Sequence, residues 1–259
     1  MRKTLLVLTL SSLCFSAGSF AFVQDWSGEP MKSVQHAANQ GDLFAQIDLG
    51  DRYANGLGVK EDDAVAVTWY RKAAEQGSET AQYRLGMMYD NGHGVSYNPK
   101  TAAQWFAKSS ENGSVEAQYY LAGMYKWGRG VPKDLGKAVE FYRQAAELNY
   151  DIAQNSLGVM YAKGLGVEKN DAEAVKWYRK AAENGYAYGQ RNLAYKYSLG
   201  EGVEQDLIQA FAWASVAASN GYSSAEQLRS DMTEKLSNEE IEQARAYAAQ
   251  YLTQYSSHK

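Results

Sequence analysis

The feature that most constrains this chain is a period of 36 residues that recurs without a single insertion. A small residue followed by glutamine marks each copy, at Ala45-Gln46, Ala81-Gln82, Ala117-Gln118, Ala153-Gln154 and Gly189-Gln190. A fixed period of this length is typical of a solenoid, in which each repeat packs on its neighbours. Residues 45–224 therefore divide into five repeats, 45–80, 81–116, 117–152, 153–188 and 189–224.

Each repeat carries the pattern of two helices joined by a glycine-rich turn. In the first helix, leucine and tyrosine follow the small residue at four-residue steps, as in Ala81, Leu85 and Tyr89, which places them on one helical face. A Gly-x-Gly-Val sequence follows, and glycine accepts the left-handed conformation that ends a helix. The predicted N-cap residues of the second helix come three residues after the valine, at Asp62, Asn98, Asp134, Asn170 and Asp206.

The second helix is predicted to bury one large aromatic residue between small ones. These aromatic residues are Trp69, Trp105, Phe141, Trp177 and Trp213. A buried side chain of this size stabilises a fold strongly, so we expect Trp105→Ala or Trp177→Ala to cost about 3–5 kcal/mol. The recurring glutamine is predicted to be a buried amide that ties the first helix to an adjacent loop or helix, because a buried polar group needs a partner.

Both ends of the repeat array are predicted to be modified. Residues 22–44 contain an N-terminal half repeat, with a helix from about 29 to 40. Residues 225–259 contain capping helices, because Arg229 and Thr233 replace the expected leucine and tyrosine. The last helix should begin with a capping box formed by Ser237 and Glu240, and it would cover the open end of the solenoid.

The combined pattern, Ala-Gln-x-x-Leu-Gly-x-x-Tyr, Gly-x-Gly-Val, Asp/Asn, Ala-x-x-Trp-Tyr and Ala-Ala-x-x-Gly, resembles the Sel1-like repeat, a relative of the 34-residue tetratricopeptide repeat. The resemblance covers residues from about 29 to 224. It implies an all-α fold, a right-handed α-solenoid of helix-turn-helix repeats whose first helices line the concave side. It also implies an adaptor function in which the protein binds another protein.

The N-terminus is typical of an export signal at residues 1–21. Arg2 and Lys3 precede an apolar run, and small residues precede the expected cleavage after Ala21. The apolar run is too short to span a bilayer, so we expect a periplasmic or secreted bacterial protein without a membrane span after cleavage. Cleavage would remove Cys14, the one cysteine in the chain, so neither a disulfide nor a cofactor is expected to stabilise the mature protein.

Charge and composition disfavour several classes of function. Removing Arg2 and Lys3 leaves 24 of the 26 basic residues against 30 acidic ones, a net charge of about −6 that argues against nucleic acid as a partner. The three histidines, His36, His93 and His258, are scattered and form no metal-ligand pattern. We therefore predict no metal, no cofactor and no catalytic residue, and a protein that is not an enzyme.

The positions of the first helix that point away from the buried row are predicted to line a binding groove centred on the second and third repeats. Tyrosine, tryptophan, methionine and arginine are enriched at protein interfaces. The predicted partner-binding residues are Tyr83, Met87, Tyr119, Tyr120, Trp127, Arg191 and Tyr195. Other repeats carry polar residues such as Asn155, Ser156 and Lys163 at the positions of Tyr119, Tyr120 and Trp127, so the fold should not require these aromatics. The alternative is that some of them pack between adjacent first helices.

The predicted function is that of an adaptor or scaffold that holds a protein or peptide segment in this groove. An immunity protein that neutralises a toxic effector enzyme and a role in host contact are alternatives within the same class. An enzyme or binding protein that acts on cell-wall material is the alternative from another class.

Overall fold

The computed structural model describes residues 25–255, which contain thirteen helices and no strand. The predicted signal at residues 1–21 lies outside this range, as do Cys14 and His258. The helices are α1 (Met31–Asn39), α2 (Leu43–Asn55), α3 (Asp63–Glu75), α4 (Glu79–Asn91), α5 (Pro99–Glu111), α6 (Val115–Trp127), α7 (Leu135–Glu147), α8 (Asp151–Lys163), α9 (Asp171–Glu183), α10 (Ala187–Leu199), α11 (Leu207–Ser219), α12 (Ala225–Thr233) and α13 (Asn238–Tyr255).

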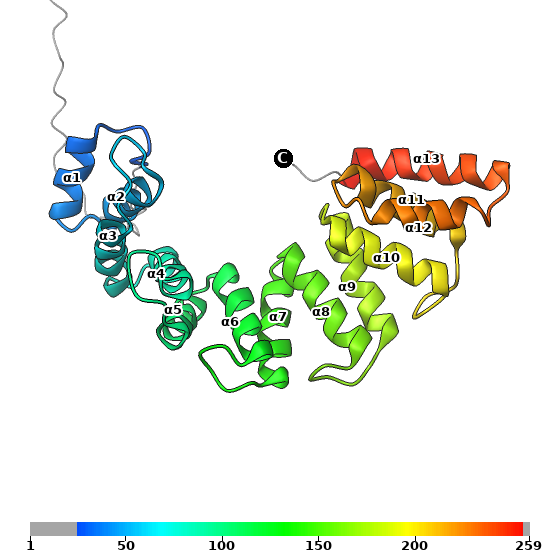
Figure 1. The fold of residues 1–259 in the computed structure, drawn as a ribbon, viewed down its shortest axis with the longest axis horizontal. Coiled ribbons are helices and arrows are strands. Elements are labelled where there is room, and N and C mark those ends of the chain that lie inside the picture. The colour runs from blue at the N-terminus through cyan, green and yellow to red at the C-terminus, as the bar shows by residue number, and fades with distance from the viewer. Residues whose placement is uncertain (1–24, 256–259) are drawn as a thin grey trace, which may run out of the picture.

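The helices pair in sequence and stack into an open arc (Figure 1). We call the first helix of each repeat (α2, α4, α6, α8 and α10) the A helix, and the second (α3, α5, α7, α9 and α11) the B helix. Both ends of the arc rise on the same side of the middle pairs (Figure 1). The predicted all-helical repeat architecture is therefore confirmed.

The local signals for helix ends act as the sequence predicts. The side chain of each predicted N-cap of a B helix accepts a hydrogen bond from the backbone N–H three residues later, as Asn98 does from Thr101 at 3.0 Å. α4 ends at Gly92, whose φ of 73° is left-handed. The second glycine of the turn is needed for stacking, because a Cβ on Gly94 would lie 2.3 Å from the backbone of Asp63 in the preceding repeat.

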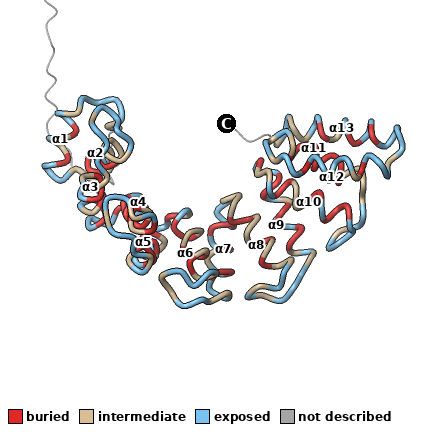
Figure 2. The backbone as a smooth tube through the Cα atoms, in the orientation of Figure 1, coloured by how far each residue is buried: buried red, intermediate tan, exposed pale blue. Residues whose placement is uncertain are grey.

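Buried residues line the facing sides of the stacked helices (Figure 2). The leucines of the A helices are fully buried or nearly so, at Leu49, Leu85, Leu121, Leu157 and Leu193. Small residues of the B helices pack between them, and Ala66, Ala102, Ala138, Ala174 and Ala210 have no exposed surface. The core is thus a continuous layer between A and B helices.

In the middle repeats, the prediction of which aromatic side chain of the B helix is buried is wrong. Trp69 and Trp213 are buried, but Trp105, Phe141 and Trp177 are only partly so. The buried ring belongs to the next residue, at Tyr70, Phe106, Tyr142 and Tyr178. Successive side chains on a helix point in directions about 100° apart. The second ring therefore points toward the A helix of the same repeat.

The recurring glutamine joins three helices, as predicted. In the second repeat, Gln82 Nε2 donates to the carbonyl of Ala74 on α3 at 3.1 Å, and Gln82 Oε1 accepts from Asn112 at the end of α5 at 2.9 Å. Gln46, Gln154 and Gln190 make the same two kinds of hydrogen bond. Each of these four buried amides therefore locks one repeat to the preceding one.

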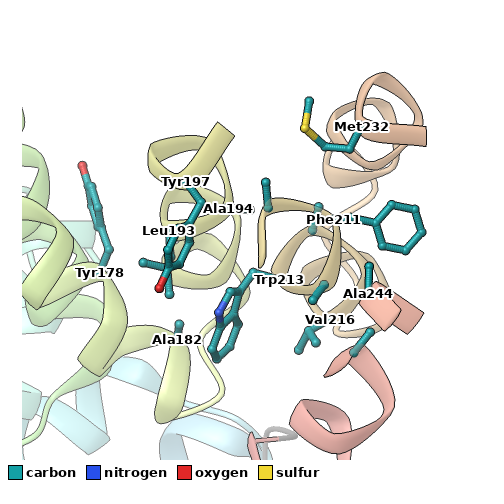
Figure 3. Close-up of a cluster of buried hydrophobic side chains, with 14 of the residues drawn as sticks. Tyr178, Ala182, Leu193, Ala194, Tyr197, Phe211, Trp213, Val216, Met232 and Ala244 are labelled. Atoms are coloured by element: carbon teal, nitrogen blue, oxygen red, sulfur yellow. The ribbon is translucent and has the colours of Figure 1, made fainter. Parts of the chain in front are cut away.

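The C-terminal helices cover the last repeat (Figure 3). Trp213 of α11 is 2% exposed and stacks on Tyr251 of α13, with ring centroids 4.5 Å apart. The capping box that begins α13 is confirmed. Ser237 N–H donates to Glu240 Oε2 at 2.8 Å, and Glu240 N–H donates to Ser237 Oγ at 3.3 Å.

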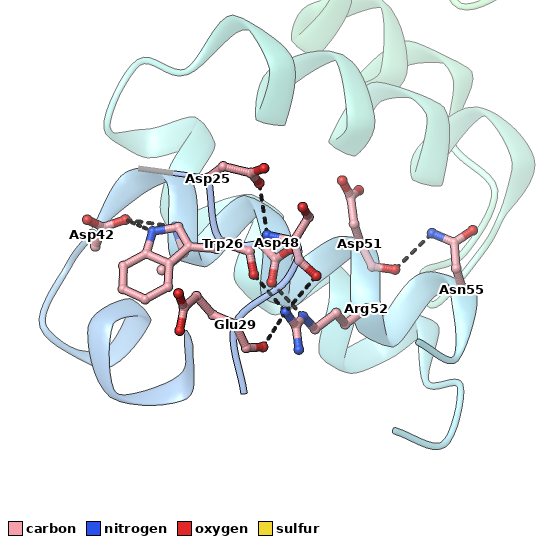
Figure 4. Close-up of polar contacts among 10 residues, drawn as sticks. Asp25, Trp26, Glu29, Asp42, Asp48, Asp51, Arg52 and Asn55 are labelled. Carbon is pink, nitrogen blue, oxygen red and sulfur yellow. Dashed lines mark hydrogen bonds and ion pairs between the residues drawn. The ribbon is translucent and has the colours of Figure 1, made fainter. Parts of the chain in front are cut away.

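At the other end, Arg52 of α2 holds the segment before α1 (Figure 4). Its guanidinium donates to the carbonyls of Trp26 at 2.8 Å and Glu29 at 2.9 Å, and it pairs with Asp48 at 2.6 Å. The indole N–H of Trp26 donates to Asp42 at 3.2 Å. These contacts fix the N-terminal edge of the arc.

Candidate functional site

Polar side chains on the unburied faces of the A helices join α2 to α4 and α8 to α10. Arg84 of α4 pairs with Asp51 of α2 at 3.2 Å, and Asn192 of α10 donates to Asn155 of α8 at 2.8 Å. These contacts join residues about one repeat apart, so the A-helix faces form one continuous surface along the arc. We call this surface the groove.

A pocket of about 390 Å³ lies in the groove over α6. It is lined by Tyr119, Tyr120, Gly123, Trp127, Arg129 and Tyr142. Trp127 stands at the C-terminal end of α6 with 73% of its surface exposed. Gly123 leaves the floor open, because a Cβ there would meet one atom within 4 Å, the Tyr142 hydroxyl at 3.8 Å. Three predicted partner-binding residues therefore share one pocket.

Tyr83, Tyr119 and Tyr120 contact one another across two repeats. Their ring centroids lie 5.6 Å apart between Tyr83 and Tyr120, and 5.6 Å apart between Tyr119 and Tyr120. Tyr120 also stacks on the buried Phe106 at 5.5 Å. Tyr120 therefore both packs on the core and lines the pocket, so for this ring the alternative of packing between adjacent A helices also holds.

The remaining predicted residues divide between the core and a second pocket. Met87 packs as a half-buried side chain against the cluster that contains Phe106. Arg191 and Tyr195 line a separate pocket of about 340 Å³ between α8 and α10, together with Lys163. The Arg191 guanidinium carbon lies 5.1 Å from the centroid of the Tyr195 ring, and Tyr195 is 41% exposed.

The second pocket is cationic. Lys196 in its wall is 6% exposed, but its ammonium is neutralised by Asp171 and Glu201, each at 2.5 Å. Lys163 and Arg191 make no ion pair within residues 25–255. Burial, together with the charge of Lys163, lowers the pKa of Lys126 on α6.

Tyr83, Tyr119 and Tyr150 are protonated hydrogen-bond donors at neutral pH. Burial raises the pKa values of Tyr83 and Tyr119 above the ordinary value for a phenol. Burial, together with the charge of Glu116, raises the pKa of Tyr150 to about 12. A partner would therefore meet neutral rings that carry hydroxyl donors.

Sequence reasoning missed three residues that shape the groove. Tyr142 comes from a B helix, and Arg129 comes from a turn, where its ion pair with Asp90 at 3.0 Å holds it at the pocket rim. Tyr150 contacts Tyr119 with ring centroids 5.5 Å apart. Only Tyr150 had a visible signal, because it replaces a serine that caps the A helix in the second and third repeats.

Across residues 25–255, no group of three or more His, Cys, Asp or Glu side chains is placed to hold a metal ion. None of the helices in this range combines the length and apolar composition needed to cross a bilayer.

Solved structures of bacterial proteins are similar to the chain, and two of them cover most of it at 32% identity. The chain is 32% identical to a Sel1 repeat protein from Oxalobacter formigenes, with a TM-score of 0.75, and the match covers 85% of this chain and 91% of that one. It is also 32% identical to a protective antigen present in uropathogenic Escherichia coli strains that displays an SLR fold, with a TM-score of 0.57. That match covers 87% of this chain and 56% of the antigen, so this chain spans little more than half of its length. None of the curated proteins compared with the chain matches it.

The Sel1 repeat model matches five consecutive segments, residues 43–78, 80–114, 115–150, 151–186 and 187–222. Its first segment begins at the first residue of α2, two residues before the start that the Ala-Gln pattern suggests. The matched segments make up well over half of the chain, and the same segments form its stacked helix pairs. The chain therefore belongs to the Sel1 repeat family.

Proposed function

We propose that this protein is a non-catalytic adaptor, exported to the periplasm or secreted, that holds a protein or peptide partner in the groove. The observation that carries the proposal is the pocket over α6, where Trp127 is 73% exposed beside Tyr119 and Tyr120. A tryptophan in water has a large apolar surface to bury, and tryptophan and tyrosine are enriched among the residues that dominate binding energy.

The arrangement of the pocket supports a protein partner. Tyr120 is held by its stack on Phe106, so its ring loses little conformational freedom when a partner binds. Trp127 is exposed at the edge of the pocket, with the Lys126 ammonium 5.0 Å from its ring centroid. A packed aromatic wall with an exposed aromatic rim and nearby cations matches the apolar centre and charged edge of a protein interface.

Two observations support export. Residues 1–21 have the pattern of a cleavable signal. The E. coli relative of 32% identity is a protective antigen. Fractionation of cells that express the full chain tests this part of the proposal, and mature protein found in the cytoplasm would contradict it.

The binding test uses tagged protein of residues 22–259 to capture partners from periplasmic extract. A captured partner is then titrated against the parent, Trp127→Ala and the control Tyr97→Ala. Tyr97 is 59% exposed in the turn after α4 and does not line the pocket. We expect Trp127→Ala to keep its melting temperature within a few degrees and to weaken binding by about 2 kcal/mol, or roughly 30-fold.

The control variant should bind like the parent. Full binding by folded Trp127→Ala would show that the partner does not use the pocket over α6. Equal loss in both variants would show that the effect is not specific to the groove.

A further inference from the structure

Six tyrosines form a row near the N-terminal ends of the A helices. In spatial order they are Tyr83, Tyr120, Tyr119, Tyr150, Tyr186 and Tyr188, and we call them the tyrosine row. Adjacent rings are 5.3–5.6 Å apart at each ring contact in this order. No ring contact joins Tyr150 to Tyr186 within residues 25–255, so the row has two parts. Burial raises the pKa of Tyr186, and Tyr119 and Tyr150 both raise it further, which places the second part near the first. The row runs from α4 to the start of α10, so it extends beyond the pocket over α6.

Two members of the row occupy positions where a different residue favours the helix. Ser78 and Ser114 cap α4 and α6, and each accepts a hydrogen bond from a backbone N–H at 3.2 Å. Tyr150 and Tyr186 take this position in α8 and α10, and neither side chain caps its helix. Serine is a preferred N-cap residue and tyrosine is not. The local preference of the helix therefore does not account for these tyrosines.

The row is reachable from solvent. Tyr188 is 50% exposed, and the other five rings are half-buried. A pocket of about 520 Å³ opens beside Tyr83 at the start of the row, and Glu79 and Glu116 line it. The row is thus a shallow aromatic strip with an opening at one end.

The charges beside Tyr83, Tyr150 and Tyr186 are mainly acidic, whereas Arg129 beside Tyr119 and Tyr120 is paired with Asp90. Glu116 and Asp151 lie close enough to Tyr150 for their charges to act on its hydroxyl, and Asp151 acts in the same way on Tyr186. Arg84 also lines the pocket beside Tyr83, but it is paired with Asp51 at 3.2 Å. The unpaired cations Lys163 and Arg191 line the other pocket, between α8 and α10.

We propose that the tyrosine row binds an extended segment of the protein partner that carries arginine or lysine side chains; this proposal rests on the proposed function. A cation over the face of an aromatic ring is attracted to it, and a neighbouring carboxylate strengthens that attraction. The phenol hydroxyls can donate to the backbone carbonyls of an extended chain, which has no internal partners for them. An acidic segment would be repelled by Glu79, Glu116 and Asp151.

The test measures the binding of two fluorescein-labelled peptides by anisotropy near physiological salt. One peptide alternates glycine with arginine, and the other alternates glycine with glutamate. The key variant is Tyr150→Ser with Tyr186→Ser, which removes two rings, keeps every carboxylate and gives α8 and α10 the serine cap of the other repeats. The matched control is Tyr97→Ser, which removes an exposed tyrosine outside the row.

We expect the parent to bind the arginine peptide at least about tenfold more tightly than the glutamate peptide. The double serine variant should weaken binding of the arginine peptide about tenfold or more, because two cation–π contacts are lost. Its melting temperature should stay within a few degrees of the parent, because the new caps offset the lost ring contacts. The control should bind like the parent.

Three results would overturn the proposal. The first is equal binding of the arginine peptide by the parent and the double serine variant, which would leave the carboxylates alone responsible. The second is preference for the glutamate peptide, which would place the partner on Lys163 and Arg191. The third is tyrosine-dependent binding of tri-N-acetylglucosamine without peptide binding, which would make the ligand a carbohydrate.

If the serine variant unfolds, Tyr150→Leu with Tyr186→Leu replaces it, because leucine keeps apolar contact but has no ring face. Its loss of arginine-peptide binding would support the proposal, and parent-like binding would overturn it. The partner captured from extract separates this proposal from the proposed function. Dependence on Trp127 but not on Tyr150 and Tyr186 would refute the tyrosine row alone. Dependence on neither would refute the proposed function.

Discussion

At the scale of single residues, the repeat depends on a close fit between one ring and one glycine. Phe106 has no exposed surface, and a Cβ added to Gly86 of α4 would lie 2.7 Å from its ring. Tyr70 meets Gly50 and Tyr178 meets Gly158 in the same way. The glycine between leucine and tyrosine in these A helices therefore leaves the space that the buried ring fills.

The first prediction contrasts two neighbouring aromatics. Phe106→Ala should cost about 3–5 kcal/mol of unfolding free energy, because it leaves a cavity against Gly86. Trp105→Ala should cost about 1–2 kcal/mol, because its ring is partly in water beneath the Lys108 ammonium at 4.4 Å. Denaturant midpoints of both variants measure the difference. An equal loss of unfolding free energy in Trp105→Ala and Phe106→Ala would show that Trp105 contributes as much to the core as Phe106 does.

At the scale of helices, one of the recurring buried glutamines, Gln118, lacks a hydrogen-bond partner for its side-chain oxygen in the described part of the chain. Leu148 stands at the end of α7 where Gln76, Asn112, Asn184 and Asn220 supply an amide in the other repeats. Gln118 Oε1 is consequently buried without a hydrogen-bond partner in the described part of the chain. Leu148 is 57% exposed, so its own side chain gains little from its position. The third repeat is therefore tied less firmly than its neighbours.

The second prediction supplies this missing partner. Leu148→Asn should raise stability by about 1 kcal/mol, because it gives the buried Gln118 oxygen a donor at little cost in apolar contact. The reverse change in the second repeat, Asn112→Leu, should lower stability by about 1–3 kcal/mol, because Gln82 Oε1 then loses its partner. Thermal or chemical unfolding of both variants measures the two effects. If Leu148→Asn does not raise stability and Asn112→Leu does not lower it, the packing of the repeats does not depend on this hydrogen bond.

At the scale of the whole molecule, many partly buried tyrosines make the fold sensitive to alkali. Burial raises the pKa values of Tyr70, Tyr83, Tyr142 and Tyr178 above the ordinary range. The pKa values of Tyr150 and Tyr186 are raised to about 12, and burial is the main cause. In the unfolded chain the same phenols ionise near pH 10.

The third prediction follows from this difference. Above roughly pH 10 the unfolded chain releases protons that the folded chain keeps, so the free energy of unfolding falls as pH rises. The melting temperature should therefore be steady near neutral pH and decline steeply between about pH 10 and 12. Tyrosinate absorbance should increase together with the loss of helical ellipticity. A smooth titration of the tyrosines in a protein that stays folded would contradict it.

Much of the fold could be predicted from the sequence because its causes are local. The N-caps of the B helices, the left-handed glycines and the capping box of Ser237 and Glu240 act within a few residues, and each is present. The spacing of Gln82 and its counterparts also predicted a buried amide, because the period places it at the same helix junction each time. In a regular repeat protein each unit packs only on its neighbours, so the local sequence patterns of one repeat predict the arrangement of the whole array.

Only the tertiary structure decided which of two adjacent rings enters the core and which stays partly in water. Trp105 and Phe106 are equally apolar in sequence, and the depth at which α4 packs on α5 selects Phe106. The pocket over α6 combines residues of an A helix, a B helix and a turn, and the tyrosine row joins rings from α4, α6 and the starts of α8 and α10. Their distances depend on the angle between stacked repeats, which arises from the summed packing of many side chains rather than from any local pattern.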